Sequence, residues 1–295
     1  TFCNVRYCVD LVRLQSNVNS TQQERSDRLF NQQMSIITLT TDMGTRDHYV
    51  GVLRGSIYKQ FPEAIIVDLS HHVKPFFVPG AAMVVKNSFK SFPKGTVHLI
   101  GVSPNRTELV DHLAVEYEGQ YFVGADNGMY HLICDREPER IFDLSRVAES
   151  AASVLFPTRD VFAVAACHLA KGGIMEVLGK PATINNELKD FVPIIDGNTI
   201  RGLAIHIDVY GNVITNIENV LFETVGQGRS FEIRFRKLQH VINKIYTSYA
   251  DVPSGEKMAL FGASGFLELA INGSNASQLL GVKREDLISV VFNPE

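Results

Sequence analysis

Two carboxylates lie in one short polar segment, where an apolar strand-like run ends and a helix-like stretch begins. The segment Thr41–Asp47 reads Thr-Asp-Met-Gly-Thr-Arg-Asp, and its acids are Asp42 and Asp47. In open α/β sheets, ligands bind at the carboxyl ends of the strands. A carboxylate there suits a ribose diol, because each oxygen can accept a hydrogen bond from a hydroxyl. The alternative is that both acids only shape the turn, with Asp47 capping the following helix.

Two further motifs in the N-terminal half carry polar side chains. Asp68–His72 contains adjacent histidines, but neighbours on a strand point to opposite faces, so one metal ion rarely binds both. No acid-rich motif follows them, and the sequence predicts no metal site. The run Gly124–Gly128 contains Asp-Asn-Gly, which is typical of a tight turn.

The C-terminal half has two Gly-containing motifs that could approach a ligand. One is Asp208–Asn212, and the other is Gly262–Phe266, which continues into Leu267–Ser274. Both are consistent with simple hairpin turns. A Gly-rich turn also lets backbone groups approach a planar ring closely.

The segments around these motifs predict two domains of different fold class. From Met34 to about Gly179, short runs rich in Val, Ile and Leu alternate with helix-like stretches, which indicates an α/β domain with a mostly parallel sheet and helices on both faces. The predicted strands there are Ile36–Thr40, Ala64–Leu69, Thr96–Gly101, Leu113–Tyr117 and Tyr121–Gly124, and the predicted helices are Asp47–Gln60, Gly80–Ser91 and Asp160–Lys171.

After about Pro181, strand-like runs follow one another without a long amphipathic helix, which favours a smaller all-β, barrel-like domain. Its predicted strands are Ile200–Asp208, Asn212–Ile217, Phe231–Phe235, Met258–Phe261, Leu267–Ala270 and Ile288–Phe292. We therefore expect an α/β domain at residues 34–182 and a β domain at residues 196–295. Residues 1–33 are rich in Gln, Asn, Ser and Arg, and we expect a leader without a role in chemistry.

The composition restricts the classes of function. The chain has 295 residues, a formal net charge of -4 and 45% hydrophobic residues, so a general nucleic-acid binder, which needs a basic surface, is not expected. No apolar run is long enough to span a bilayer. The four cysteines form no CxxC pair, and reduced cysteines in a cytoplasmic protein are the expectation.

The order and spacing of the motifs together resemble a family of enzymes that cleave S-adenosylmethionine (SAM), which comprises fluorinases, chlorinases and SAM hydroxide adenosyltransferases. The resemblance runs from about Met34 to Phe292. The matching residues are Asp42 with Gly44, Asp68 with His71, Asp126-Asn127-Gly128, Arg159-Asp160, Asp208 with Gly211-Asn212, and Leu267–Ser274.

The resemblance implies a homotrimer in which SAM, as substrate and without a further cofactor, lies between one subunit's N-terminal domain and its neighbour's C-terminal domain. It implies that Asp42 holds the ribose, that Asp47 lies near the methionine end and that Asp208 pairs with the methionine ammonium. The remaining substrate-binding residues implied are Phe76 near the ribose, Asn212 with Tyr210 at the adenine, and Ser264, Asn272 and Ser274 in the last two motifs.

The nucleophile is where the sequence departs from the family. The turn Glu118–Gln120 is short, whereas fluorinases carry an insertion there, so the hydrolase branch is favoured. That branch holds its water with an Asp/Arg/His trio, and the corresponding positions here are Ser103, Val110–Asp111 and Pro157. The trio is absent as such.

We therefore expect a rebuilt water site that uses Thr158, Ser103 and Arg106. The expected reaction is displacement at C5′ by water, which gives adenosine and L-methionine. The alternatives are a chlorinase-like halide adenosyltransferase, and a protein that binds SAM or adenosine without turnover.

Overall fold

The protein divides into two compact units, with the division after residue 188. The computed structural model describes residues 35–151, 155–188, 192–235 and 241–294. The predicted leader, residues 1–33, lies outside the described residues. The boundaries at residues 182 and 196 stay predictions.

The first unit is built on a six-stranded sheet in the order β2-β1-β3-β5-β4-β6. The pairs β1–β2, β1–β3 and β3–β5 are parallel, while β4 pairs antiparallel with β5 and with β6. The strands are β1 (Ile36–Thr41), β2 (Ile65–Ser70), β3 (Val97–Gly101), β4 (His112–Tyr117), β5 (Gln120–Ala125) and β6 (Arg140–Asp143).

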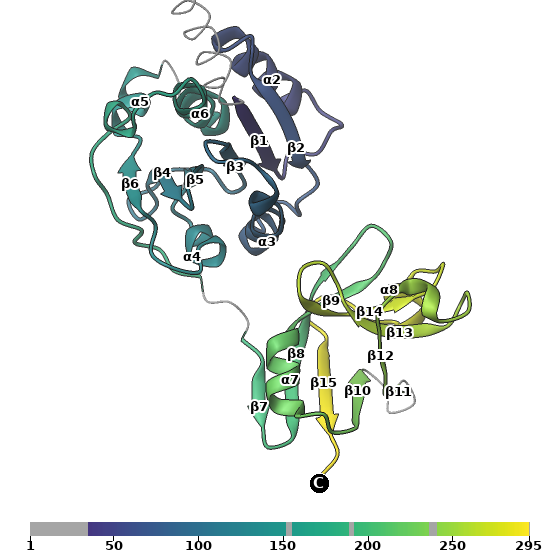
Figure 1. The fold of residues 1–295 in the computed structure, drawn as a ribbon. Helices are drawn as coiled ribbons and strands as arrows, with labels where there is room; N and C mark the ends of the chain where they lie inside the picture. The colour runs from purple at the N-terminus through teal and green to yellow at the C-terminus, as the bar shows by residue number, and fades with distance from the viewer. Residues whose placement is uncertain (1–34, 152–154, 189–191, 236–240, 295) are drawn as a thin grey trace, which may run out of the picture. The chain divides into compact units, whose positions relative to one another are not determined.

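Helices cover both faces of this sheet (Figure 1). On one face, α2 (Tyr49–Gln60) and α6 (Ala163–Ala170) bury Leu53, Ile57 and the alanines of α6 against β1 and β3. On the other, α3 (Val78–Ser88) and α4 (Met129–Ile133) form a second core. A short helix, α5 (Ser145–Ser150), precedes α6. The predicted mixed α/β fold is confirmed.

The second unit contains one nine-stranded sheet that curls into a half-barrel, mostly with antiparallel neighbours, in the order β11-β10-β15-β8-β9-β14-β13-β12 with β7 beside β8 (Figure 1). Its longer strands are β8 (Thr199–Ile207), β9 (Val213–Glu218), β10 (Phe231–Phe235), β13 (Lys257–Phe261), β14 (Phe266–Ile271) and β15 (Leu287–Phe292). The shorter ones are β7 (Ile194–Asp196), β11 (Val241–Ile242) and β12 (Ile245–Tyr246). Two short helices, α7 (Asn219–Gly226) and α8 (Ala276–Leu280), interrupt the strands.

One predicted helix differs in a way that affects the site. The stretch predicted as Asp160–Lys171 begins as a π-helical turn, Thr158–Phe162, and continues as α6. A π turn widens the helix locally and is frequent at functional sites. Among the described helices, none combines the length and apolar character that crossing a membrane requires.

A buried histidine makes the first unit sensitive to acid. His98 in β3 is fully buried, with Thr38 Oγ1 2.7 Å from its Nδ1 and Gln120 Oε1 2.8 Å from its Nε2. Burial lowers the pKa of His98 to about 4, although the hydrogen bond to Gln120 partly opposes this shift.

We expect the free energy of unfolding to fall as the pH is lowered from about 6.5 to about 4, because the unfolded chain takes up this proton first. The loss from His98 is on the order of 3 kcal/mol. Urea unfolding at a series of pH values measures it. His98→Gln should flatten the dependence.

Candidate functional site

The loop after β1 is tied to the loop after β2 through Asp42. Oδ2 of Asp42 accepts a hydrogen bond of 2.8 Å from the backbone N–H of Phe76, and Gly44 N–H donates to the carbonyl oxygen of His71 over 2.7 Å. Phe76 has a φ of +63° and an exposed side chain. One predicted ribose ligand therefore fixes the backbone of the predicted ribose-packing aromatic, and the structure brings these two residues together.

A chain of polar side chains connects the residues beside this loop. Arg54 in α2 contacts Asp68 at the end of β2, and Nε2 of His71 lies 3.1 Å from Oδ1 of Asp68 without the alignment of a hydrogen bond. Nδ1 of His71 lies 2.8 Å from Thr41 Oγ1. Burial, followed by the nearby Arg54 and His72, lowers the pKa of His71, so the ring is neutral at pH 7.

Asp47 does not cap helix α2, although its position in the sequence offered that alternative. Helix α2 has His48 as its N-cap residue, with no side-chain capping hydrogen bond and no acid in its first turn. The capping interpretation of Asp47 is therefore wrong. Its side chain is exposed.

The end of β3 packs closely against Thr158. Thr158 is fully buried, and a Cβ added at Gly101 would lie 2.5 Å from its Cγ2 and 2.9 Å from its Oγ1. Among the described residues, Oγ1 of Thr158 has no hydrogen-bond partner. Ser103 follows two residues after Gly101, with a φ of +46°, and its carbonyl oxygen accepts a 3.2 Å hydrogen bond from Nδ2 of Asn127. Gly101 therefore places Thr158 near the start of the Ser103 loop.

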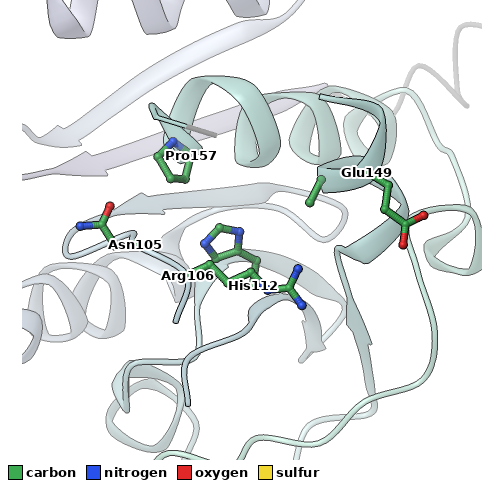
Figure 2. A pocket seen from close by; sticks show the side chains of 6 residues that line it. Asn105, Arg106, His112, Glu149 and Pro157 are labelled. Atoms are coloured by element: carbon green, nitrogen blue, oxygen red, sulfur yellow. The ribbon is translucent and has the colours of Figure 1, made fainter. Parts of the chain in front are cut away.

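Arg106 lines a hollow beside these residues. The hollow has a volume of about 410 Å³, and the residues that line it are Asn105, Arg106, His112, Ala148, Glu149 and Pro157 (Figure 2). Pro157 directly precedes Thr158, whereas Thr158 and Ser103 themselves lie outside this lining. NH2 of Arg106 lies 3.1 Å from Oδ1 of Asp111 in a half-exposed ion pair. The sequence did not single out His112, which had no flanking motif.

The turn Asp126-Asn127-Gly128 has a structural role that the sequence only partly indicated. Gly128 has a φ of +95°, as a tight turn requires. Asp126 is fully buried, and its Oδ2 accepts hydrogen bonds from the backbone N–H groups of Asn185 (2.8 Å) and Asn186 (3.2 Å). This carboxylate therefore anchors the segment that leaves the first unit.

In the second unit, Asp208 organises its own turn. Oδ1 of Asp208 accepts hydrogen bonds from the backbone N–H groups of Tyr210 (2.9 Å) and Asn212 (2.8 Å), and Oδ2 accepts one from Nδ2 of Asn212 (3.0 Å). Asn212 is buried, while the side chain of Tyr210 is 75% exposed. The structure thus brings these three predicted ligands into one turn, with a tyrosine ring free to meet a ligand.

The side chains of residues 262–274 are only partly available to bind a ligand. Ser264 is exposed in the turn between β13 and β14. Nδ2 of Asn272 donates a 2.7 Å hydrogen bond to the carbonyl oxygen of Val252, and the N–H of the exposed Ser274 donates to the carbonyl oxygen of Ile271. The amide of Asn272 is therefore used to hold the loop.

Reasoning from the sequence did not single out a buried acid in this unit. Glu268 in β14 is 6% exposed, and its Oε1 accepts a 2.6 Å hydrogen bond from the hydroxyl of Tyr249. Burial is the main cause that raises the pKa of Glu268; the nearby Asp208 adds to the shift and the Tyr249 bond opposes it. The only sign of it in the sequence is that an acid interrupts the otherwise apolar run of β14.

Steric contact at Gly101 gives a test of how closely Thr158 must sit. Gly101→Ala should destabilise the protein by about 1–3 kcal/mol through overpacking and displace Thr158. Thermal unfolding measures the first effect, and the rate of the SAM cleavage that the resemblance implies measures the second. Gly55→Ala in α2, where an added Cβ meets nothing within 4 Å, is the matched control and should be neutral or stabilising. If Gly101→Ala unfolds and turns over like Gly55→Ala, the close packing is not required.

Models of known protein domains match both units of the chain. Models of the SAM hydroxide adenosyltransferase N-terminal and C-terminal domains match residues 37–179 and 202–289. A protein of Methanocaldococcus jannaschii named (R)-S-adenosyl-L-methionine hydrolase is 30% identical over 88% of this chain and 97% of its own. A Thermus thermophilus protein of the same name is 29% identical, with 85% and 97% covered. A fluorinase of Actinoplanes sp. is 23% identical, with 81% and 91% covered.

A solved structure supports the same assignment. An uncharacterized conserved protein from Thermotoga maritima superimposes with a TM-score of 0.79 at 30% identity, covering 87% of this chain and 99% of that one. In the described residues, no group of three His, Cys, Asp or Glu side chains is arranged to hold a metal ion. The sequence match covers both domains, and the fold agrees with it over most of the chain: the protein belongs to the SAM hydroxide adenosyltransferase family.

Proposed function

We propose that this protein cleaves SAM by displacement at C5′ with water, which gives adenosine and L-methionine. The observation that carries the proposal is the similarity to relatives named (R)-S-adenosyl-L-methionine hydrolase, at 27–30% identity over 85–88% of the chain. The relatives named fluorinase are 22–24% identical.

The reaction makes few chemical demands on the protein. The oxygen of water bonds to C5′ while the C5′–S bond breaks and its electron pair goes to sulfur. Methionine leaves as a neutral thioether, so no general acid is needed. The water must lose a proton and must be held in line with the breaking bond, and positioning of this kind can lower the barrier by roughly 7–11 kcal/mol.

The residues that would hold SAM come from both units. In the first, Asp42 would accept hydrogen bonds from the ribose hydroxyls beside Phe76, with Asp47 towards the methionine end. In the second, Asp208 would meet the ammonium, and Tyr210 and Asn212 the adenine. Ser264, Asn272 and Ser274 would complete the adenine side. The fixed Asp42–Phe76 and Asp208–Asn212 geometries support these roles.

Thr158, Ser103 and Arg106 would form the water side of the site. The buried hydroxyl of Thr158, which has no partner in the described parts of the chain, supports this role, because a hydroxyl can both donate to and accept from water. Arg106 could stabilise a hydroxide-like nucleophile, although a guanidinium cannot act as a base.

The test is turnover of SAM in oxygen-18 water, followed by mass spectrometry of the nucleoside. We expect one labelled oxygen in the 5′-hydroxyl of adenosine. Chloride-dependent formation of 5′-chloro-5′-deoxyadenosine would move the protein to a halide adenosyltransferase. Tight SAM binding without any nucleoside product would leave a binding protein.

We also propose a homotrimer with SAM between subunits, and a cytoplasmic location. Two separate units that each carry part of the ligand set are compatible with sites shared between chains. Cys134 and Cys167, the two cysteines within the described residues, are both free, as a reducing compartment favours. Light scattering during size-exclusion chromatography tests the trimer.

Complementation tests the shared site. Asp42→Ala and Asp208→Asn should each impair turnover at low SAM. If sites form between chains, co-expression of the two variants should restore part of the activity, because some sites then combine two intact halves. If each chain forms its own site, every site carries a defect and activity should not return.

A further inference from the structure

We propose that His112 holds the attacking water and accepts its proton. The inference rests on the proposed hydrolysis of SAM and adds a residue to it. His112 is the first residue of β4 and faces the hollow beside Arg106 and Pro157 (Figure 2).

The hydrogen bonds of His112 define its tautomer. Nε2 lies 2.8 Å from the carbonyl oxygen of Pro104, which can only accept, so Nε2 carries the hydrogen and donates it. Nδ1 is therefore the ring's acceptor. It is buried, and among the described residues it has no hydrogen-bond partner. The side chain is 4% exposed, and a buried acceptor left unpaired costs free energy unless a water or ligand meets it.

The surroundings keep this nitrogen free to accept a proton. Burial, and secondarily the charge of Arg106, lowers the pKa of His112, while the hydrogen bond to Pro104 and the charge of Asp111 act in the opposite direction. The ring is consequently neutral at pH 7. Glu149 from α5 also lines the hollow, and Phe162 from the π-helical turn packs edge-on against the ring at 4.7 Å.

The hollow adjoins the residues proposed for the water side. Pro157 lines it and directly precedes Thr158. Pro104, which fixes His112, directly follows Ser103. Phe162 lies in the same π-helical turn as Thr158. The loop before β4 and the start of the π-helical turn therefore place His112, Thr158 and Ser103 around one region.

The proton then has a defined destination. As the water oxygen bonds to C5′ and the C5′–S pair moves to sulfur, one water proton passes to Nδ1 of His112. The product is neutral adenosine, neutral-thioether methionine and an imidazolium that donates from both nitrogens. Asp111 offers negative charge to that imidazolium, and it returns the proton to solvent through the hollow.

Two substitutions test whether Nδ1 of His112 acts as a base. His112→Gln can keep a donor for the Pro104 carbonyl but removes Nδ1. His112→Asn places an amide oxygen near the position of Nδ1, which can hold a water but is too weak a base to take its proton. We expect both variants to lose at least about 100-fold in kcat, as for other general bases, with KM for SAM within about threefold.

The pH profile distinguishes proton transfer from a structural role. The kcat of the unmodified protein should fall on the acid side of a pKa below 6.5, and His112→Gln should lack this limb. Thermal unfolding of each variant accompanies the kinetics. If His112→Gln does not fold, His112→Asn and the profile of the unmodified protein still decide.

Separate outcomes overturn the inference and the proposed function. A His112→Gln protein with unchanged kcat, or a variant that keeps the acid limb, overturns the role of His112 alone, and so does an unmodified protein without that limb. An unmodified protein that releases no adenosine from SAM overturns the hydrolase itself. Halide-dependent product from the unmodified protein overturns both, because a halide needs no base.

Discussion

Asp208→Asn is expected to weaken the binding of SAM about 10- to 100-fold and to change the affinity for adenosine by less than threefold. The proposed partner of the carboxylate is the methionine ammonium, which adenosine lacks. A hydrogen bond to a charged group contributes about 1.5–3 kcal/mol, and each 1.4 kcal/mol is tenfold in affinity. Isothermal titration with SAM and with adenosine measures both values.

Asparagine is the informative substitution because of the turn that Asp208 holds. Its amide oxygen can still accept from the backbone N–H groups of Tyr210 and Asn212, as Oδ1 does now. In the asparagine variant the bond now donated by Nδ2 of Asn212 is replaced by one in the opposite direction, once the Asn212 amide turns so that its oxygen accepts from the new NH2 group. Alanine would remove these bonds and, with them, every side-chain hydrogen bond to Asn212, and would loosen the proposed adenine ligand. Asp208→Ala should therefore weaken both ligands.

Asp42→Ala provides the comparison at the other end of the substrate. It removes the proposed ribose ligand and the tether to Phe76, and both SAM and adenosine carry the ribose, so both should bind more weakly. If Asp208→Asn and Asp42→Ala affect the two ligands in the same ratio, the assignment of the two ends is wrong.

Much of the fold could be predicted because its core strands are apolar runs with clear ends. β1, β2 and β3 and the helices between them follow directly from such runs. The reversed direction of β4 could not be read from Leu113–Tyr117, because a buried strand has the same composition whichever way its neighbours run. β6 was missed because Arg140–Asp143 has charges at both ends.

The proposed site could be predicted from the sequence only where local motifs carry it. Asp42 and Asp208 stand in turns whose residue types indicate a special backbone. His112 has no such marker: its proposed role depends on the carbonyl of Pro104 and on Pro157, and the sequence does not show that these lie together. Asn272 shows the converse, since its amide is used by Val252, a contact made 20 residues away.

Thr158→Val should lower kcat about 10- to 100-fold while leaving SAM affinity within about threefold and raising, or at least not lowering, the melting temperature. Valine has nearly the shape of threonine, so the contact with Gly101 is kept. The hydroxyl is fully buried, and no described residue bonds to it, so its removal relieves an unpaired group.

The fall in rate follows if that hydroxyl orients the attacking water, because a bond made mainly in the transition state affects kcat and not ground-state binding. Single-turnover kinetics, SAM titration and thermal unfolding measure the three quantities. Thr158→Ser keeps the hydroxyl, loses only the methyl group, and should keep most of the rate. A valine variant that is less stable and equally active would mean that the hydroxyl has a structural partner. A parallel loss of rate and SAM affinity would place Thr158 on the substrate and not on the water.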